Sequence, residues 1–184
     1  KIAMIIDGGP VGIGIESTII DLTEDTPMVL RPGYITPQML SKVLGKEVVI
    51  DPGIIAADDT RKPKAPGMKY KHYAPKADMA IVDGTRKHVI AKINELVASH
   101  RDDGKKIAVI ATEETKQFYD ADVVLSMGSR ADEDSIAHEL YRILRDCDEL
   151  DVDVIFSESF STPRIGQAIM NRMLKAAGYH LITL

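Results

Sequence analysis

Two short polar segments near the start of the sequence contain residue types that bind small charged molecules. Ser17 and Thr18 follow Glu16, and adjacent hydroxyl residues of a strand point to opposite faces, so one can contact a carboxylate or an ammonium group. Arg31 precedes a Pro-Gly pair, which places a guanidinium at a strand end, where it can bind phosphate through two hydrogen bonds. An edge strand and a structural ion pair are the simpler alternatives for the two segments.

A third segment, residues 65–75, interleaves cations with aromatic side chains. Six basic residues lie between Asp59 and Asp78, with no acidic residue among them. This composition suits stacking on a nucleotide base while lysines hold the phosphates, and a solvated linker is the alternative. The central residues of the segment are Lys69, Tyr70, Lys71, His72 and Tyr73.

The other candidate residues do not predict a reactive centre. The glycines between Gly8 and Gly14 lack the Lys-Ser/Thr ending of a Walker loop and the full dinucleotide spacing, so they indicate a backbone turn. Cys147 falls on the apolar stripe of an expected helix, which favours a packing role. Metal-ligand spacing is absent among His88, His100, His138 and His180. We therefore assign no catalytic residue and no metal ligand.

Residues 1–50 are expected to form short strands and one helix. Apolar runs bounded by Gly, Pro or Asp predict strands at 1–7, 17–22, 28–31 and 47–50. Thr36 and Pro37 predict the start of a helix and Gly45 its end. The apolar stripe of this helix is Met39, Leu40, Val43 and Leu44. These elements cannot cover both faces of a sheet, so we interpret the region as the back part of a domain.

Residues 51–78 are rich in Pro and Gly and indicate a long linker, after which apolar strands alternate with amphipathic helices. Strands are expected at 79–82, 106–111, 122–126, 152–157 and 180–183, and helices at 86–100, 113–119, 132–149 and 163–177. The alternation predicts a three-layer α/β domain with a doubly wound, mainly parallel five-stranded sheet in residues 79–184.

The composition is typical of a globular cytoplasmic protein, with 45% hydrophobic residues, 28% charged residues and a formal net charge of -5. A single cysteine excludes an internal disulfide, and no apolar run approaches the roughly 20 residues that cross a bilayer. The whole net charge of -5 lies in residues 79–184, which argues against a broad RNA-binding surface there. The basic stretch before it points to an anionic small molecule or RNA phosphate.

Four segments together resemble one protein family, the two-domain threonylcarbamoyl-AMP synthases. The resemblance spans nearly the whole chain and implies three parts. These are the end of a YrdC-like catalytic domain at 1–50, an interdomain linker and lid at 51–78, and a Rossmann-like domain at 79–184. The family's basic ATP-binding motif and its Ser-Ala-Asn segment have no counterpart here, so the chain looks like a C-terminal fragment. The four segments are ESTIIDL at 16–22, LRPG at 30–33, PGMKYKHYAP at 66–75 and AIMNRMLKAA at 168–177.

The resemblance also implies an activity. Members of the family condense L-threonine, bicarbonate and ATP into threonylcarbamoyl-AMP and release pyrophosphate, and the product feeds the threonylcarbamoyladenosine modification of tRNA. By the family pattern Ser17 would contact threonine, while Arg31 and Tyr70 would bind ATP. Mg2+ is expected with the nucleotide. The lid residues would be Lys69, His72 and Tyr73.

Without the rest of the pocket, the chain alone is expected to be inactive. The alternative from another class is a non-catalytic regulatory module that binds a nucleotide or RNA. Direct contact with nucleic acid stays open in both interpretations, since the basic stretch suits either ligand.

Overall fold

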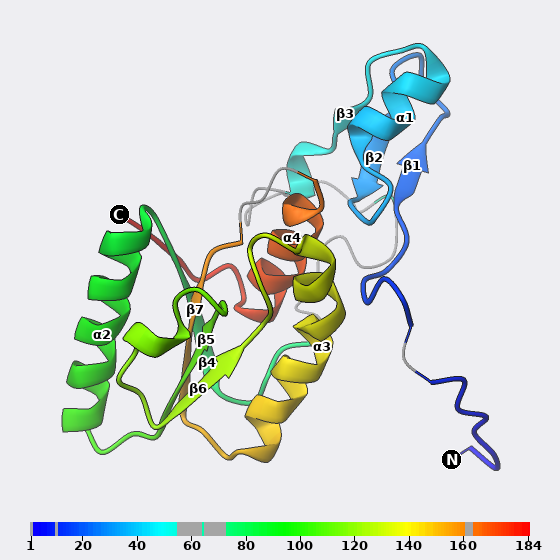
Figure 1. Cartoon of the computed structure of the whole chain (residues 1–184). Coiled ribbons are helices and arrows are strands. Elements are labelled where there is room, and N and C mark those ends of the chain that lie inside the picture. The colour runs from blue at the N-terminus through cyan, green and yellow to red at the C-terminus, as the bar shows by residue number, and fades with distance from the viewer. Residues whose placement is uncertain (1, 10, 55–63, 65–72, 161–163) are drawn as a thin grey trace.

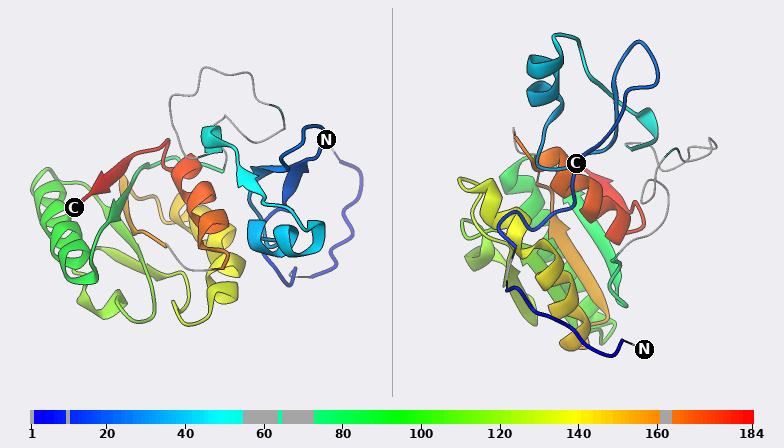
Figure 2. Two further views of the ribbon diagram at one scale, coloured as in Figure 1. Left: turned by 90° about the horizontal axis from the view of Figure 1, so that it is seen from above. Right: turned by 90° about the vertical axis from the view of Figure 1, so that its right-hand side faces the viewer.

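The computed structural model describes residues 2–9, 11–54, 64, 73–160 and 164–184. Its strands form two sheets, one of five strands and one of three. The two sheets lie side by side, and Figure 2 shows helices between them. The larger sheet belongs to the second half of the chain and the smaller sheet to the first.

The larger sheet is entirely parallel, as each of its neighbouring strand pairs shows. Its strands are β4 (Asp78–Asp83), β5 (Ile107–Ala111), β6 (Val123–Ser126), β7 (Val154–Glu158) and β8 (Leu181–Thr183), in the order β6-β5-β7-β4-β8. Every residue of β5 and β7 is buried, because helices cover both faces of a parallel sheet. The predicted parallel five-stranded sheet is confirmed.

Within the described part of the chain, three helices cover the larger sheet, so the predicted three layers are confirmed (Figure 1). One face packs against α2 (Arg86–Asp102), and the other against α3 (Glu133–Glu149) and α4 (Gly166–Ala176). The buried side of each helix has the 3.6-residue spacing expected from the sequence. The buried residues of α2 are Val89, Ile93 and Val97, and those of α3 include Ile136, Leu140, Ile143 and Cys147.

The strand order of the larger sheet differs from that of dinucleotide-binding Rossmann folds. In those folds the first two strands are neighbours, whereas here β7 lies between β4 and β5. The carboxyl ends of β4 and β7 therefore lie next to each other, although the strands are far apart in sequence.

The helix predicted at residues 113–119 is wrong. Only a short 3-10 helix, η2 (Lys116–Phe118), follows β5. The Thr115 hydroxyl accepts from the Thr112 amide at 3.2 Å, and the two hydroxyls lie 2.8 Å apart. Such local side-chain bonds compete with a regular helix, so the crossover from β5 to its parallel neighbour β6, residues 112–122, contains η2 in place of an α-helix.

The smaller sheet contains β1 (Ile19–Asp21), β2 (Met28–Arg31) and β3 (Val49–Ile50). The first pair is antiparallel and the second is parallel. The helix between β2 and β3, α1 (Pro37–Leu44), begins and ends where the sequence predicts. The Met39 amide donates to the Thr36 hydroxyl at 3.3 Å, and Gly45 has the left-handed φ of 65° common after a helix.

The strand predicted at residues 1–7 is wrong. Within residues 2–9 the structure has no strand, and the side chains of Ile2, Met4, Ile5 and Ile6 are all at least 77% exposed. An apolar, β-branched run becomes a strand only when another strand pairs with it, and none of the described residues does so here.

The segment that follows is held against α3 by Gly14. A Cβ at this position would lie 2.4 Å from the His138 Cα and 2.6 Å from the Ala137 carbonyl oxygen. Its φ of 80° also disfavours other residues. Glycine therefore allows the chain to touch the helix backbone shortly before it enters the smaller sheet.

Candidate functional site

Ser17 and Arg31 are in direct contact, although 14 positions separate them in the chain. Arg31 donates from Nε to the Ser17 carbonyl oxygen at 2.9 Å and from Nη2 to the Ser17 hydroxyl at 3.2 Å. The antiparallel pairing of β1 with β2, in which Ile19 lies opposite Arg31, brings them together. The two residues that the sequence analysis selected separately thus form one pair.

The geometry of this pair leaves hydrogen-bond donors for a ligand. Since the Ser17 hydroxyl accepts from Arg31, its own proton is available to an acceptor. Nη1 of Arg31 takes no part in the two bonds to Ser17. Ser17 is exposed and Arg31 is partly exposed, so an anion such as a carboxylate or a phosphate can reach both.

The neighbouring hydroxyl of Thr18 has a structural partner. It donates to the carbonyl oxygen of Ile35 at 2.7 Å and so ties β1 to the turn that precedes α1. The structure therefore distinguishes the two adjacent hydroxyls, which the sequence could not.

Gly33 permits the close approach of the two segments. A Cβ on Gly33 would lie 2.5 Å from the Thr18 nitrogen and 2.6 Å from the Glu16 carbonyl oxygen, far inside contact distance. Any larger residue would separate the turn after Arg31 from the backbone around Ser17. The Pro-Gly turn noted in the sequence thus places Arg31 at the strand end and also allows the two segments to pack closely.

Arg172 of α4 clamps the residues next to Ser17 and Arg31. It donates from Nε to Oε2 of Glu16 at 2.8 Å, from Nη2 to the Glu16 carbonyl oxygen at 3.4 Å, and from Nη1 to the Pro32 carbonyl oxygen. Its side chain is only 5% exposed. A buried guanidinium with these three contacts fixes both strands of the site to the second half of the chain.

The ionisation of Glu16 depends on its two neighbours, Arg172 and Tyr141. Burial raises the pKa of Glu16, but Tyr141 and Arg172 outweigh it and hold the pKa below its usual value. Burial and the neighbouring Glu16 carboxylate raise the pKa of the Tyr141 phenol. Glu16 is therefore an anion at neutral pH and a suitable partner for the Arg172 cation.

Two more polar residues of α4 are buried beside Arg172. Lys175 donates from Nζ to the Asn171 side-chain oxygen at 3.0 Å, and Asn171 donates to the Ile54 carbonyl oxygen at 3.3 Å. Burial, followed by the Arg172 charge, lowers the pKa of Lys175 to about 8. Sequence reasoning assigned no role to these residues, although the polar side chains at positions 171, 172 and 175 stand among mostly apolar residues of the helix.

Of the predicted lid residues, only Tyr73 belongs to the described structure; Lys69, His72 and the predicted ATP-binding residue Tyr70 lie outside it. The Tyr73 ring packs against the Tyr141 ring of α3, with 4.5 Å between the ring centroids and 53° between their planes. Tyr73 therefore packs on the same Tyr141 that interacts with the Glu16 carboxylate.

The remaining candidates behave as packing residues or solvent-facing groups. Cys147 is buried, and burial raises the pKa of its thiol to about 12, which confirms the packing role. In the described parts of the chain, no three His, Cys, Asp or Glu side chains are grouped so that they could hold a metal ion. No helix in those parts is long and apolar enough to span a bilayer.

Comparison with known proteins gives one consistent family. Residues 35–178 match the family model "Threonylcarbamoyl-AMP synthase, C-terminal domain". The Bacillus subtilis protein named threonylcarbamoyl-AMP synthase is 44% identical over 182 residues, 99% of this chain and 51% of that protein. Its Pyrococcus abyssi namesake is 46% identical over 183 residues, with the same shares. The chain thus spans about half the length of these curated relatives.

Solved structures agree with this result. The crystal structure of Pyrococcus abyssi Sua5 complexed with L-threonine is 43% identical, with a TM-score of 0.86 over 97% of this chain and 50% of that one. A C-terminal Sua5 domain from Pyrococcus horikoshii is 35% identical, with a TM-score of 0.50 over 60% of this chain and 100% of that one. Both the smaller and the larger sheet therefore have counterparts in a solved structure.

Proposed function

The chain belongs to the threonylcarbamoyl-AMP synthase family, and from that premise we propose that the protein makes threonylcarbamoyl-AMP. The substrates would be L-threonine, bicarbonate and ATP, and pyrophosphate would be released. The product would serve the threonylcarbamoyladenosine modification of tRNA in the cytoplasm. Because the chain spans about half of its relatives, this activity belongs to a protein in which the other half is also present.

The contact between Ser17 and Arg31 is the observation that best supports the proposal. The Ser17 proton suits the threonine carboxylate, and the free edge of the Arg31 guanidinium suits a nucleotide phosphate. One pair of residues thus addresses both substrates and would hold them side by side. Bound L-threonine in the related Pyrococcus abyssi structure is consistent with this assignment.

The proposed chemistry needs no covalent bond to the protein. The threonine amine and bicarbonate form a carbamate with loss of water, and a carbamate oxygen attacks the α-phosphorus of ATP. The bond from that phosphorus to the oxygen of the departing pyrophosphate breaks in the same step. Such a reaction depends on alignment and on neutralising phosphate charge, which are the roles available to Ser17 and Arg31.

The predicted lid and metal ion complete this proposal. Tyr70 would contact ATP, and Lys69, His72 and Tyr73 would close over it and exclude water. Tyr73 has a suitable position, because its ring packs on Tyr141, which adjoins Glu16. Mg2+ would accompany the nucleotide phosphates and neutralise part of their charge, and we assign no side chain to it.

The test uses two proteins, the 184-residue chain and a fusion that adds the portion of the Bacillus subtilis relative that this chain does not match. Pyrophosphate release and threonylcarbamoyl-AMP, detected by mass spectrometry, are measured with and without L-threonine. We expect threonine-dependent turnover from the fusion only. A folded fusion that binds ATP or RNA without turnover would instead support the non-catalytic module, and full activity of the chain alone would contradict the incomplete pocket.

A further inference from the structure

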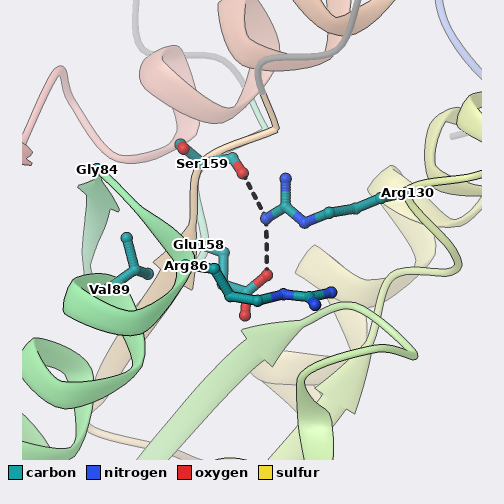
Figure 3. A pocket seen from close by; sticks show the side chains of 6 residues that line it. All are labelled: Gly84, Arg86, Val89, Arg130, Glu158 and Ser159. Atoms are coloured by element: carbon teal, nitrogen blue, oxygen red, sulfur yellow. Dashed lines mark hydrogen bonds and ion pairs between the residues drawn. The ribbon is translucent and has the colours of Figure 1, made fainter.

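A cavity of about 190 Å³ opens at the carboxyl ends of β4 and β7, outside the Ser17 and Arg31 pair. In open α/β sheets this edge is where ligands bind, because the loops after parallel strands meet there. Figure 3 shows that its walls come from the turn after β4, the start of α2, the end of β7 and the loop before α3. The lining residues are Gly84, Arg86, Val89, Arg130, Glu158 and Ser159.

Glu158 is the buried charge of this cavity, with a side chain that is 2% exposed. Its Oε1 accepts from the Tyr119 hydroxyl at 2.6 Å, and its Oε2 accepts from Nη2 of Arg130 at 2.8 Å. Both carboxylate oxygens therefore already have strong donors. Glu158 serves to position Arg130 and does not attract a second cation.

Arg130 is held in a single orientation at the cavity wall. Besides Glu158, its Nη2 donates to the Ser159 carbonyl oxygen at 2.8 Å, and the guanidinium lies 5.5 Å from the Phe160 ring centroid. These contacts use one nitrogen, so in the described structure Nε and Nη1 make no hydrogen bond. A guanidinium oriented in advance loses little side-chain entropy when it binds an anion.

Arg86 brings a second positive charge. It is exposed, and among the described residues it forms no hydrogen bond or ion pair. In Figure 3 its side chain runs past Glu158 and ends below the guanidinium of Arg130, which enters from the other wall. Arg86 is also the first residue of α2, a 17-residue helix that has no acidic residue in its first turn and no side-chain bond from Thr85, the residue before it. The free amides and dipole of this helix end add to the positive potential.

The geometry points to a binding site for a small oxyanion of the phosphate class. Among the described residues that line the cavity, two guanidinium groups outnumber the one carboxylate, and that carboxylate is already paired. Pockets for drug-sized ligands commonly measure about 300–1,000 Å³, so a cavity of about 190 Å³ fits phosphate or pyrophosphate better than a nucleotide. The site binds its anion without L-threonine or ATP, so it stands apart from the proposed function.

Calorimetric titration of the full chain with inorganic phosphate, pyrophosphate and acetate tests this site. We expect the two phosphates to bind and acetate to bind at least tenfold more weakly. Arg86→Ala should weaken phosphate binding about tenfold, which corresponds to about 1.4 kcal/mol. Lys87→Ala is the matched control, because it removes the same charge from the adjacent exposed position and should change binding less than twofold.

Unfolding midpoints measured without anion verify that both variants remain folded, which the exposure of Arg86 and Lys87 favours. Arg130→Lys is a second variant, which keeps the charge and loses the bond geometry, and it should also weaken phosphate at least fivefold. Three results would overturn the site: no binding of either phosphate at millimolar concentration, equal binding of acetate, or equal loss in the Arg86 and Lys87 variants.

Discussion

Arg172 and Glu16 form a 2.8 Å ion pair between residues 156 positions apart. Arg172 belongs to α4, which covers the larger sheet, whereas Glu16 directly precedes Ser17, so the pair connects that sheet to the candidate substrate site. The same guanidinium also reaches the Pro32 carbonyl oxygen next to Arg31. The position of Ser17 relative to Arg31 therefore depends on a helix formed near the other end of the chain.

Arg172→Ala should lower the free energy of unfolding by about 2–3 kcal/mol. Removing one partner of a buried pair commonly costs about 3–5 kcal/mol, and the 30% exposure of the Glu16 side chain reduces that penalty. Urea unfolding of the full chain measures the change. Arg142→Ala is the control, since Arg142 is 61% exposed and its pairs with Glu139 and Asp146 should contribute less than about 1 kcal/mol. Equal losses in both variants would contradict the clamp.

Ser17→Ala and Arg31→Ala should not have additive effects on threonine use by the fusion. Ser17→Ala removes one hydrogen bond to the charged threonine carboxylate, worth about 1.5–3 kcal/mol, and should raise the threonine KM roughly tenfold or more. Arg31→Ala should weaken ATP use and also disturb threonine, because Arg31 orients the Ser17 hydroxyl. Kinetics of the double mutant should show a coupling of about 1 kcal/mol, and strict additivity would show that the contact does not matter for binding.

Gly33→Ala should destabilise the chain by more than 2 kcal/mol, because the added methyl group would overlap backbone atoms that cannot move aside independently. Gly12→Ala is the matched control. A Cβ there meets nothing within 4 Å, and the stability should change by less than about 1 kcal/mol. Both free energies come from urea unfolding, and a neutral Gly33→Ala would show that the turn does not approach β1 so closely.

Lys175 should make the stability of the chain depend on pH. The folded state lowers its pKa from 10.5 to about 8, so between these values the unfolded chain retains a proton that the folded chain has released. Lys175 alone then makes unfolding less favourable by about 1–2 kcal/mol between pH 8 and 9.5, whereas the raised pKa of the Cys147 thiol acts in the opposite direction. The stability difference between the wild type and Lys175→Met should therefore grow by about 1–2 kcal/mol over this range, whereas Lys42→Met, at an exposed position, should follow the wild type. Unfolding measured at several pH values would refute the prediction if the wild type and Lys175→Met showed the same pH dependence.

Much of the larger sheet could be predicted because fully buried parallel strands are continuous apolar runs, such as Ile107–Ala111. Predictions failed where side-chain hydrogen bonds or the lack of a strand partner outweighed the apolar pattern of the sequence. The hydroxyl bonds of Thr112 and Thr115 replaced the expected helix after β5. At residues 2–9 an apolar run found no strand to pair with among the described residues.

The residues of the candidate site could be predicted from the sequence, but the contacts between them could not. Ser17 and Arg31 could be selected from residue type and local turns, but their contact results from the register of β1 on β2. Arg172 could not be predicted as their clamp, because its partners are two backbone carbonyls and one carboxylate more than 130 positions away. Only tertiary packing creates such a relationship.

The strand order also has a consequence for the time at which the protein can fold during synthesis. β4 pairs with β7 and β8 and has no partner among the strands made soon after it. A ribosome must therefore translate about 70 more residues before β4 can enter the sheet, and about 100 before it has both neighbours. We expect nascent chains that end before Val154 to leave the apolar strand Asp78–Asp83 accessible to chaperones, and the Arg172 clamp to close among the last events.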